Sequence, residues 1–357
     1  MISAYAPAGL EILGNHTDYN EGIAISAALQ FGVSVEGDAR TDNQIGLLLE
    51  PTGESENFGV QNLSKSVQYG WVNEIKGVLQ QLQKYGIPFQ GFDLRIQHNV
   101  PKYFDFIAEG TLGLATVLFL QKLFPFNAQP SMLAKLVHDA QVGLGKTYAS
   151  LLGPMASVFA RQDSVAVIDF RNLEANLIRF PDAYRFVICD GGARNLLLNA
   201  KMKIRRNQCE EAIRTIKGRS PEVKALRDVN PYEIQQVAGL FNEYVFRTVM
   251  HVCGEIRMVR ESVEALQQGD VSVLAQNMRH SHESSRRSME NSTTGLDRVV
   301  EAAGRMPGVL GSRLTGYGFG GPTLHLVEAA QAETFIQALA AERLGEGHVA
   351  QLSNGAA

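Results

Sequence analysis

The sequence has few cysteines and no long apolar run. Its three cysteines, Cys189, Cys209 and Cys253, lie far apart and form no Cys-x-x-Cys or Cys/His pattern, so neither a disulfide framework nor a zinc site is indicated. No stretch of about 18 uncharged apolar residues occurs, and the N-terminus lacks the basic and apolar parts of a secretory signal. We therefore expect a protein of a reducing, cytoplasmic compartment, with no bound metal and no membrane partner.

An excess of positive charge is also absent. The 357 residues include 33 Lys+Arg against 37 Asp+Glu, which gives a formal net charge of -4. Such a chain has no basic field that would bind nucleic acid non-specifically. It does have length for about two domains of roughly 150 residues. It also has 34 glycines, many in short clusters, where backbone can approach a ligand closely.

Short apolar runs alternate with longer helical patterns, which is typical of a protein with both helices and strands. Strands are predicted at residues 31–35, 92–96, 165–169, 186–189 and 323–327. Helices are predicted at 71–85, 112–124, 132–145 and 330–343, and most of 200–304 is expected to be helical. A turn at Pro181 predicts an N-terminal domain of residues 1–182 and a C-terminal domain of residues 183–357.

The segment APAGLEILGNHTDYNEG, residues 6–22, resembles the signature of galactokinases, which belong to the GHMP small-molecule kinase superfamily. Further matches follow in the family's order at residues 71–77, 190–195, 205–210, 251–257, 281–284 and 315–321. Together they span essentially the whole chain. The resemblance implies an α+β architecture, the two-domain GHMP kinase fold, with sugar and nucleotide bound in an inter-domain active-site cleft.

The family's phosphate-binding loop is the part that differs most. Galactokinases have Pro-x-Gly-x-Gly-Leu-Ser-Ser-Ser-Ala at the start of a helix whose amides hold the anion. An ungapped reading from Pro101 predicts a degenerate loop, with bulk and negative charge in place of glycines and hydroxyls. A carboxylate beside a triphosphate costs about 4 kcal/mol at roughly 4 Å for an effective dielectric of about 20. The loop positions concerned are Lys102, Tyr103, Asp105, Glu109 and Gly110.

The resemblance also implies a sugar site that is partly replaced. The family's arginine falls on Gly9 and its glutamate on Asn15, whereas Asp18 remains as a sugar-contacting carboxylate. The family's Met-Asp-Gln motif falls on residues 152–154, so the carboxylate that would orient the reacting hydroxyl is absent. The family's sugar-facing tyrosine falls on Met202. The predicted substrate-binding residues are Asn15, His16, Asp18, Gly153 and Met202.

Two further groups of residues are candidates for a role in the cleft. The glycine loop with Gly316, Gly318, Gly320 and Gly321 is expected to use positive φ angles to pack tightly there. Catalytic candidates are Asp18, Asp105 and Glu109. Asp18 either accepts a sugar hydroxyl or caps its turn. Asp105 and Glu109, four residues apart, form either an acid/base pair or a solvated helix start.

From these replacements we expect a galactokinase-like pseudokinase that has lost ATP-dependent sugar phosphorylation and keeps a carbohydrate-binding cleft, without a cofactor, and acts either as a non-kinase enzyme or as a sugar-binding or regulatory protein. One alternative is an active sugar kinase with an atypical ATP site, which would use ATP and Mg and need cations such as Lys102 or Lys146. Another is a hydrolase, lyase or isomerase of a sugar derivative that uses the three catalytic candidates. In each case the ligand is a small carbohydrate such as galactose. No nucleic-acid or membrane partner is expected, and the sequence identifies no protein partner.

Overall fold

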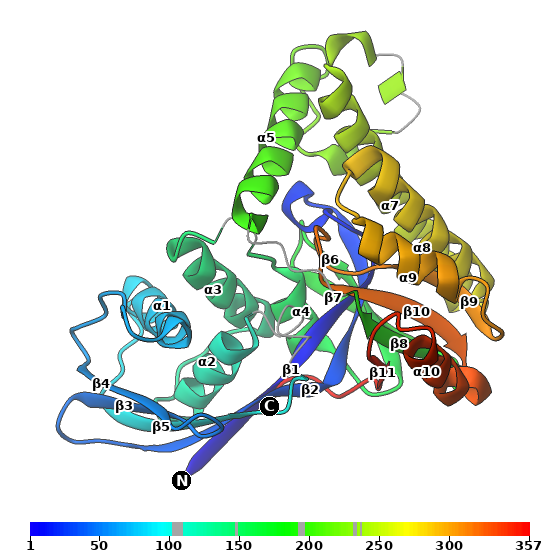
Figure 1. The fold of residues 1–357 in the computed structure, drawn as a ribbon. Helices are drawn as coiled ribbons and strands as arrows, with labels where there is room; N and C mark the ends of the chain where they lie inside the picture. The colour runs from blue at the N-terminus through cyan, green and yellow to red at the C-terminus, as the bar shows by residue number, and fades with distance from the viewer. Residues whose placement is uncertain (102–109, 147–148, 192–196, 231–233, 236–237) are drawn as a thin grey trace. The chain divides into compact units, whose positions relative to one another are not determined.

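The computed structural model describes residues 1–101, 110–146, 149–191, 197–230, 234–235 and 238–357. They form two compact units. Unit 1 consists of residues 1–9, 28–162 and 353–357, and unit 2 of residues 10–27 and 163–352. The chain passes from one unit to the other within β1 (Ile2–Leu13) and again within β2 (Ile23–Ala39), as Figure 1 shows. The family-type domain division at residue 182 stays a prediction.

Unit 1 contains a mixed sheet with the strand order β4-β3-β5-β2, and β1 pairs with β2. Its further strands are β3 (Gln44–Leu49), β4 (Glu54–Gly59) and β5 (Phe92–His98). β3 runs parallel to β5, whereas β4 and β2 pair antiparallel with their neighbours. Residues of β5 alternate between buried, such as Phe92, and exposed, such as Asp93. This period of two is that of a sheet with one covered face.

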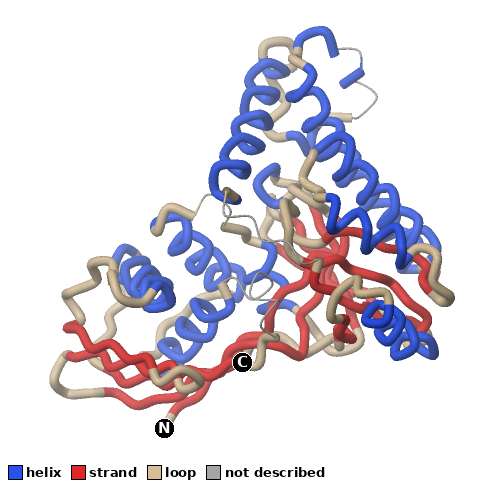
Figure 2. The backbone as a smooth tube through the Cα atoms, viewed as in Figure 1, coloured by secondary structure: helices blue, strands red, loops and turns tan. Residues whose placement is uncertain are grey.

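Helices pack on the sheet of unit 1 (Figure 2). They are α1 (Gly70–Lys84), α2 (Thr111–Leu123), α3 (Pro130–Gly143) and α4 (Leu152–Phe159). In α1 the apolar residues recur every three to four positions, from Val72 to Leu82, and all are fully buried. Gly86, with a φ of +69°, follows the end of α1. The predicted helices at 71–85, 112–124 and 132–145 are thus confirmed.

Unit 2 contains two groups of strands. β6 (Ser164–Asp169) pairs with residues 23–26 of β2 and with β7 (Glu174–Arg179). A separate antiparallel sheet has the order β11-β8-β10-β9. Its strands are β8 (Tyr184–Asp190), β9 (Val309–Leu314), β10 (Pro322–Glu328) and β11 (Gly347–Ala350). Helices α9 (Thr294–Ala303) and α10 (Ala332–Ala341) bury Val299 and Phe335 in one core with this sheet.

The remainder of unit 2 is helical, as expected for residues 200–304. It contains α5 (Leu198–Lys217), α7 (Glu243–Gln267), α8 (Ser272–Ser284) and a π-helical turn, η4 (Ser285–Met289). Short 3-10 turns are η1 (Asp18–Asn20), η2 (Leu226–Asp228), η3 (Ala238–Leu240) and η5 (Ala329–Gln331). The Asn242 side chain caps α7 by accepting from the Val245 amide at 3.0 Å. The fold as a whole is the expected mixture of helices and sheets.

Candidate sugar site and phosphate-type helix terminus

The motif of residues 14–22 forms the turn between β1 and β2 and lies in unit 2. Gly14 has a φ of +111°, and a Cβ there would lie 2.7 Å from the Ala24 Cα, so only glycine fits. The Thr17 hydroxyl donates to the Gly14 carbonyl at 2.8 Å and lies 2.9 Å from the Ile23 carbonyl. His16 itself has a φ of +61°. The motif is therefore a rigid turn whose shape is set by backbone contacts.

Asn15 and His16 are fully buried and bonded within unit 2. The side-chain nitrogen of Asn15 donates to the Gly316 carbonyl at 2.6 Å and to the Glu11 carboxylate at 3.1 Å. His16 Nδ1 lies 2.6 Å from the Tyr19 hydroxyl and its Nε2 lies 3.2 Å from the Tyr317 carbonyl. A bond to the Tyr317 carbonyl places the proton on Nε2 and makes the Tyr19 hydroxyl the donor to Nδ1, whereas a bond from the Asn291 side-chain nitrogen, also 3.2 Å from Nε2, requires Nε2 to accept.

The pKa values of His16 and Tyr19 are both shifted toward the neutral form of the group. Burial, together with the charge of the neighbouring His251, lowers the pKa of His16 well below its ordinary value. Burial raises the pKa of Tyr19 well above its ordinary value, and Cys209 and Asp18 add to the effect. The imidazole is therefore neutral and the phenol protonated at neutral pH. Neither group therefore carries a charge at neutral pH.

The Asp18 carboxylate of the motif is half-buried. It accepts a hydrogen bond from the Tyr317 hydroxyl. The Arg206 guanidinium lies 4.3 Å from the centroid of the Tyr19 ring. Burial lowers the pKa of Arg206, but Tyr317, Asp18 and Tyr19 around it raise that pKa above its ordinary value. Asp18 thus lies in a polar surface with two phenols and one cation beside it.

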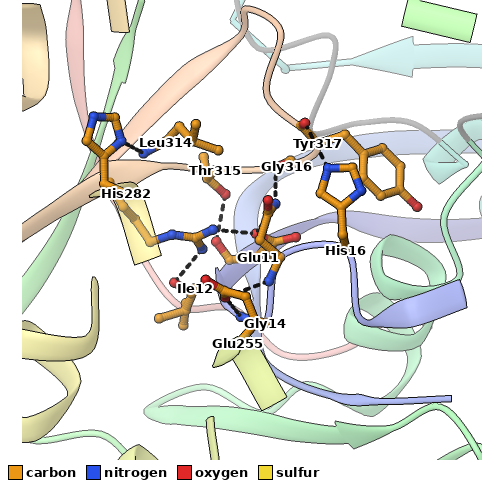
Figure 3. A network of polar contacts seen from close by, with 12 residues as sticks. Glu11, Ile12, Gly14, His16, Glu255, His282, Leu314, Thr315, Gly316 and Tyr317 are labelled. Atoms are coloured by element: carbon orange, nitrogen blue, oxygen red, sulfur yellow. Dashed lines mark hydrogen bonds and ion pairs between the residues drawn. The ribbon is translucent and has the colours of Figure 1, made fainter. Parts of the chain in front are cut away.

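A buried ion pair lies next to the motif, and Figure 3 labels its carboxylate partner, Glu11. Arg313, which is fully buried, donates to Glu11 at 2.9 Å and to the Ile12 carbonyl at 2.8 Å. Burial raises the pKa of Glu11 to about 7, although the charge of Arg313 opposes this rise. Glu255 of α7 accepts from the backbone amides of Gly14 at 3.1 Å and residue 15 at 2.8 Å. These contacts join β1, β9 and α7 around the turn.

The glycine loop after β9 packs against the same motif. Gly316, Gly318, Gly320 and Gly321 all have positive φ angles, between +69° and +128°. A Cβ on Gly318 would lie 2.4 Å from the Asn291 carbonyl oxygen. The Asn291 amide donates to the Tyr317 carbonyl at 2.9 Å. These φ angles are the ones predicted for the loop, and its role in a cleft stays a prediction.

The other predicted sugar residues lie in different places. Met202 is fully buried in α5 of unit 2. Gly153 lies in the first turn of α4 in unit 1, where its carbonyl oxygen is 2.6 Å from the position of a Cβ on Gly9. The roles predicted for these residues in substrate binding stay predictions. Of the loop after Pro101, Lys102, Tyr103, Asp105 and Glu109 lie outside the described residues.

Gly110, the last residue of that loop, precedes α2 in unit 1. It has a φ of +81° and is the N-cap residue of this 13-residue helix. A Cβ on Gly110 would lie 3.4 Å from Gln141 Nε2. The Gln141 side chain is fully buried, and neither its nitrogen nor its oxygen is bonded within the part of the chain that the structure describes. In the first turn of α2, the Gly113 amide donates to Glu74 at 3.0 Å.

Among the described residues, no group of three or more His, Cys, Asp or Glu side chains is placed to hold a metal ion. Cys189, Cys209 and Cys253 are buried, free thiols. Among the described helices, none is long and apolar enough to cross a membrane.

Two family models match segments of the chain that carry this site. The galactokinase galactose-binding signature matches residues 2–37, and the GHMP kinase C-terminal model matches residues 262–344. A galactokinase of Chloroflexus aggregans is 31% identical over 338 residues, which cover 95% of this chain and 87% of that protein. The chain belongs to the galactokinase family. The galactokinase of Homo sapiens is 32% identical over 339 residues, with 93% of this chain and 85% of the human protein covered.

Solved structures show the same fold. Lactococcus lactis galactokinase complexed with galactose matches with a TM-score of 0.93 at 23% identity, covering 100% of this chain and 94% of that one. Methanococcus jannaschii mevalonate kinase matches with a TM-score of 0.67 at 18% identity, covering 99% and 98%. The expected GHMP kinase fold is therefore confirmed for this galactokinase family member.

The expectation that sugar phosphorylation has been lost is wrong, and so is the pseudokinase interpretation. Proteins named as galactokinases match over more than nine-tenths of the chain at 31% and 32% identity, which favours the active-kinase alternative. The physical reason for the error is that phosphoryl transfer depends on positioning and charge neutralisation by many groups. Replacement of individual motif residues in an ungapped reading therefore does not establish loss of the reaction.

Several residues around the motif were not recognised from the sequence. Tyr317 stands between two glycines in the sequence. A large aromatic side chain in a glycine loop was the one sign that it could contact the motif. Glu255 lies in a segment that carried the family resemblance, but nothing showed that its carboxylate would bind the turn amides. Asn291 had no sequence signal, because its partners at residues 15, 16 and 317 are distant in the chain.

Proposed function

We propose that this galactokinase family member is an ATP-dependent kinase that phosphorylates galactose or a closely related sugar, with an ATP site of atypical composition. The observation that carries the proposal is the intact turn of residues 14–22, which holds the Asp18 carboxylate partly accessible beside neutral His16 and Tyr19. A carboxylate that accepts hydrogen bonds is a strong and directional partner for a sugar hydroxyl. Lactococcus lactis galactokinase, which shares the fold, was solved with galactose bound.

The nucleotide side of the proposal rests on the N-terminus of α2 in unit 1. The first amides of α2, which follow the glycine N-cap, have no carbonyl partner within the helix, and a helix N-terminus favours phosphate. The buried Gln141 carboxamide, unbonded within the described residues, could donate to a phosphate oxygen near Gly110. Lys146, in the same unit, is a candidate cation. These features fit a nucleotide phosphate.

Magnesium fits the same region. Mg²⁺ is commonly held by one or two protein carboxylates together with substrate phosphates, so a dedicated cluster of acidic side chains is not needed. Glu74, which already lies at the first turn of α2, would be the protein ligand. When bound, the metal ion would neutralise phosphate charge in the transition state.

The reaction would transfer the γ-phosphoryl group from ATP to a sugar hydroxyl. The hydroxyl oxygen forms the new bond to phosphorus, the bond from phosphorus to the bridging oxygen breaks, and ADP leaves while the hydroxyl proton passes to solvent. Gly153 stands where the family's catalytic carboxylate is expected, so the chain's own contribution would be orientation of the sugar by Asp18. The three free thiols and the use of ATP are in keeping with the cytoplasm.

The proposal is tested by measuring ADP release from Mg-ATP in the presence of galactose, with glucose, mannose and a no-sugar blank as comparisons. We expect ADP release that requires galactose and saturates with its concentration. The matched control is Asp182→Asn, because Asp182 is an exposed carboxylate whose partner Arg179 is also exposed. ADP release at the blank rate with every sugar, from protein shown to be folded, would contradict the proposed function.

A further inference from the structure

Tyr317 occupies the space immediately beside the motif residues that the proposed sugar site uses. Its side chain is only 6% exposed. The hydroxyl donates to Asp18, and the ring centroid lies 5.1 Å from that of His16 and 6.4 Å from that of Tyr19. Figure 3 shows the Tyr317 and His16 rings side by side. His16 is fully buried in this arrangement, so Tyr317 is part of what separates it from solvent.

The backbone of residue 317 is held firmly in place. Its carbonyl accepts from the Asn291 amide at 2.9 Å and contacts His16 Nε2 at 3.2 Å. Gly316 and Gly318 on either side have φ angles of +69° and +74°. The Tyr317 side chain therefore reaches Asp18 from a fixed backbone position, and only rotation about its side-chain bonds can move the phenol away.

The phenol hydroxyl has the same hydrogen-bonding capacity as a sugar hydroxyl, because both can donate to a carboxylate. A ligand hydroxyl that bonds Asp18 must therefore share the carboxylate with Tyr317 or displace it. The ring adds a steric requirement, since a sugar must fit beside it or cause it to rotate. Displacing a partner from a charged hydrogen bond opposes ligand binding.

We propose that Tyr317 is a specificity-determining residue of the sugar site: it competes with a ligand hydroxyl for Asp18 and restricts the space beside His16. This inference rests on the proposed function in taking galactose as the ligand. It goes beyond that function by assigning a selective role to a residue of the glycine loop. The hydroxyl and the ring make separate contributions, and substitutions can separate them.

The experiment measures galactose binding by calorimetry for the wild-type chain, Tyr317→Phe and Tyr317→Ala. Tyr317→Phe removes the hydroxyl that bonds Asp18 but keeps the ring, whereas Tyr317→Ala removes the hydroxyl and the ring. We expect galactose affinity to increase about tenfold or more in Tyr317→Ala, with Tyr317→Phe between it and wild type, because charged hydrogen bonds are worth about one to two powers of ten in affinity. Thermal unfolding and circular dichroism establish that each variant is folded.

Phe319→Leu is the matched control, since Phe319 is a buried aromatic residue of the same loop, 4% exposed, next to Lys201. Its substitution is expected to leave galactose affinity unchanged. A second readout compares galactose with each of its monodeoxy derivatives. Loss of the hydroxyl that bonds Asp18 should cost more affinity in Tyr317→Ala than in wild type, where the phenol still satisfies the carboxylate.

Equal or weaker galactose binding by folded Tyr317→Phe and Tyr317→Ala would overturn the role of Tyr317, and so would an absence of binding by all variants. The proposed function is judged separately by sugar-dependent ADP release. Tight galactose binding without turnover would count against the kinase, not against competition by Tyr317. Turnover by variants whose galactose affinity equals that of wild type would support the kinase and count against competition by Tyr317.

Discussion

The carbonyl oxygen of Gly153 lies 2.6 Å from where a Cβ on Gly9 would be. Both residues belong to unit 1, and their backbones touch. Any side chain at position 9 would meet backbone that cannot rotate away. An arginine at position 9 therefore does not fit this chain, because its Cβ would meet the backbone of the first turn of α4, which begins at Leu152.

We expect Gly9→Ala to destabilise the protein by about 1–3 kcal/mol, the range for overpacking a buried site. Urea unfolding followed by circular dichroism measures the difference. Gly70→Ala is the matched control, because a Cβ there meets nothing within 4 Å and alanine favours the helix. A Gly9→Ala protein as stable as the control would show that the two backbones are not in contact.

Gln141 allows the phosphate-side assignment to be tested by two opposing effects. Gln141→Leu replaces a fully buried carboxamide, unbonded within the described residues, by an apolar group of similar size. We expect unchanged or higher stability, by about 1–2 kcal/mol, because an unsatisfied polar group is removed. We also expect the KM for ATP to rise while the affinity for galactose stays the same. An unchanged KM for ATP would remove Gln141 from the nucleotide site.

The ion pair of Glu11 and Arg313 is expected to be costly to break. Glu11→Gln leaves a fully buried guanidinium without its counter-charge and should lower the unfolding free energy by about 3–5 kcal/mol. The double variant Glu11→Gln with Arg313→Met should lose less than Glu11→Gln alone, because the uncompensated charge is gone. Chemical unfolding of wild type, Glu11→Gln, Arg313→Met and the double variant measures the coupling, and simple additivity of the two substitutions would argue against a buried pair.

Acid sensitivity should come in part from His325. Burial lowers the pKa of His325 to about 3, where its ring contacts the Thr323 and Ser312 hydroxyls. A histidine with a lowered folded-state pKa contributes stability above the unfolded-state pKa of about 6.5, and that stability is lost as the pH falls below it. Between pH 7 and pH 5 the loss from one such group is about 2 kcal/mol.

The comparison is therefore between wild type and His325→Gln, each unfolded by urea at pH 7 and at pH 5. The variant is expected to start less stable but to lose about 2 kcal/mol less over that interval. His348, which is not fully buried, provides the control substitution His348→Gln. Parallel pH profiles for wild type and His325→Gln would show that His325 titrates normally in the folded protein.

Much of the fold could be predicted from the sequence, because local periodicity determines it. The stripe from Val72 to Leu82 identifies α1, and the alternation in residues 92–96 identifies β5. The positive φ angles of the glycine loop also follow from composition. Residues 1–9 and 353–357 both belong to unit 1. This could not be predicted, since it depends on pairing between distant parts of the chain.

The candidate site was predictable in its motif and not in its contacts. Asp18 was recognised because the residues around it resemble a known signature. That Tyr317 would donate to it could not be foreseen, since 299 residues separate them in the chain. The expected loss of phosphorylation was wrong for a related reason: the joint absence of loop, arginine and carboxylate does not reveal which other groups act in their place, and phosphoryl transfer uses different sets of positioning and neutralising groups.

The proposed phosphorylation of galactose depends on a sugar site built on Asp18. The most direct measurement is single-turnover formation of a sugar phosphate from Mg-ATP and galactose, followed by phosphorus NMR, for wild type and Asp18→Asn. We expect a new sugar phosphate signal with wild type. In folded Asp18→Asn we expect the rate of its formation to be reduced about 10–100-fold, because a charged hydrogen bond is lost. No sugar phosphate from wild type, or equal rates for both proteins, would contradict the proposal.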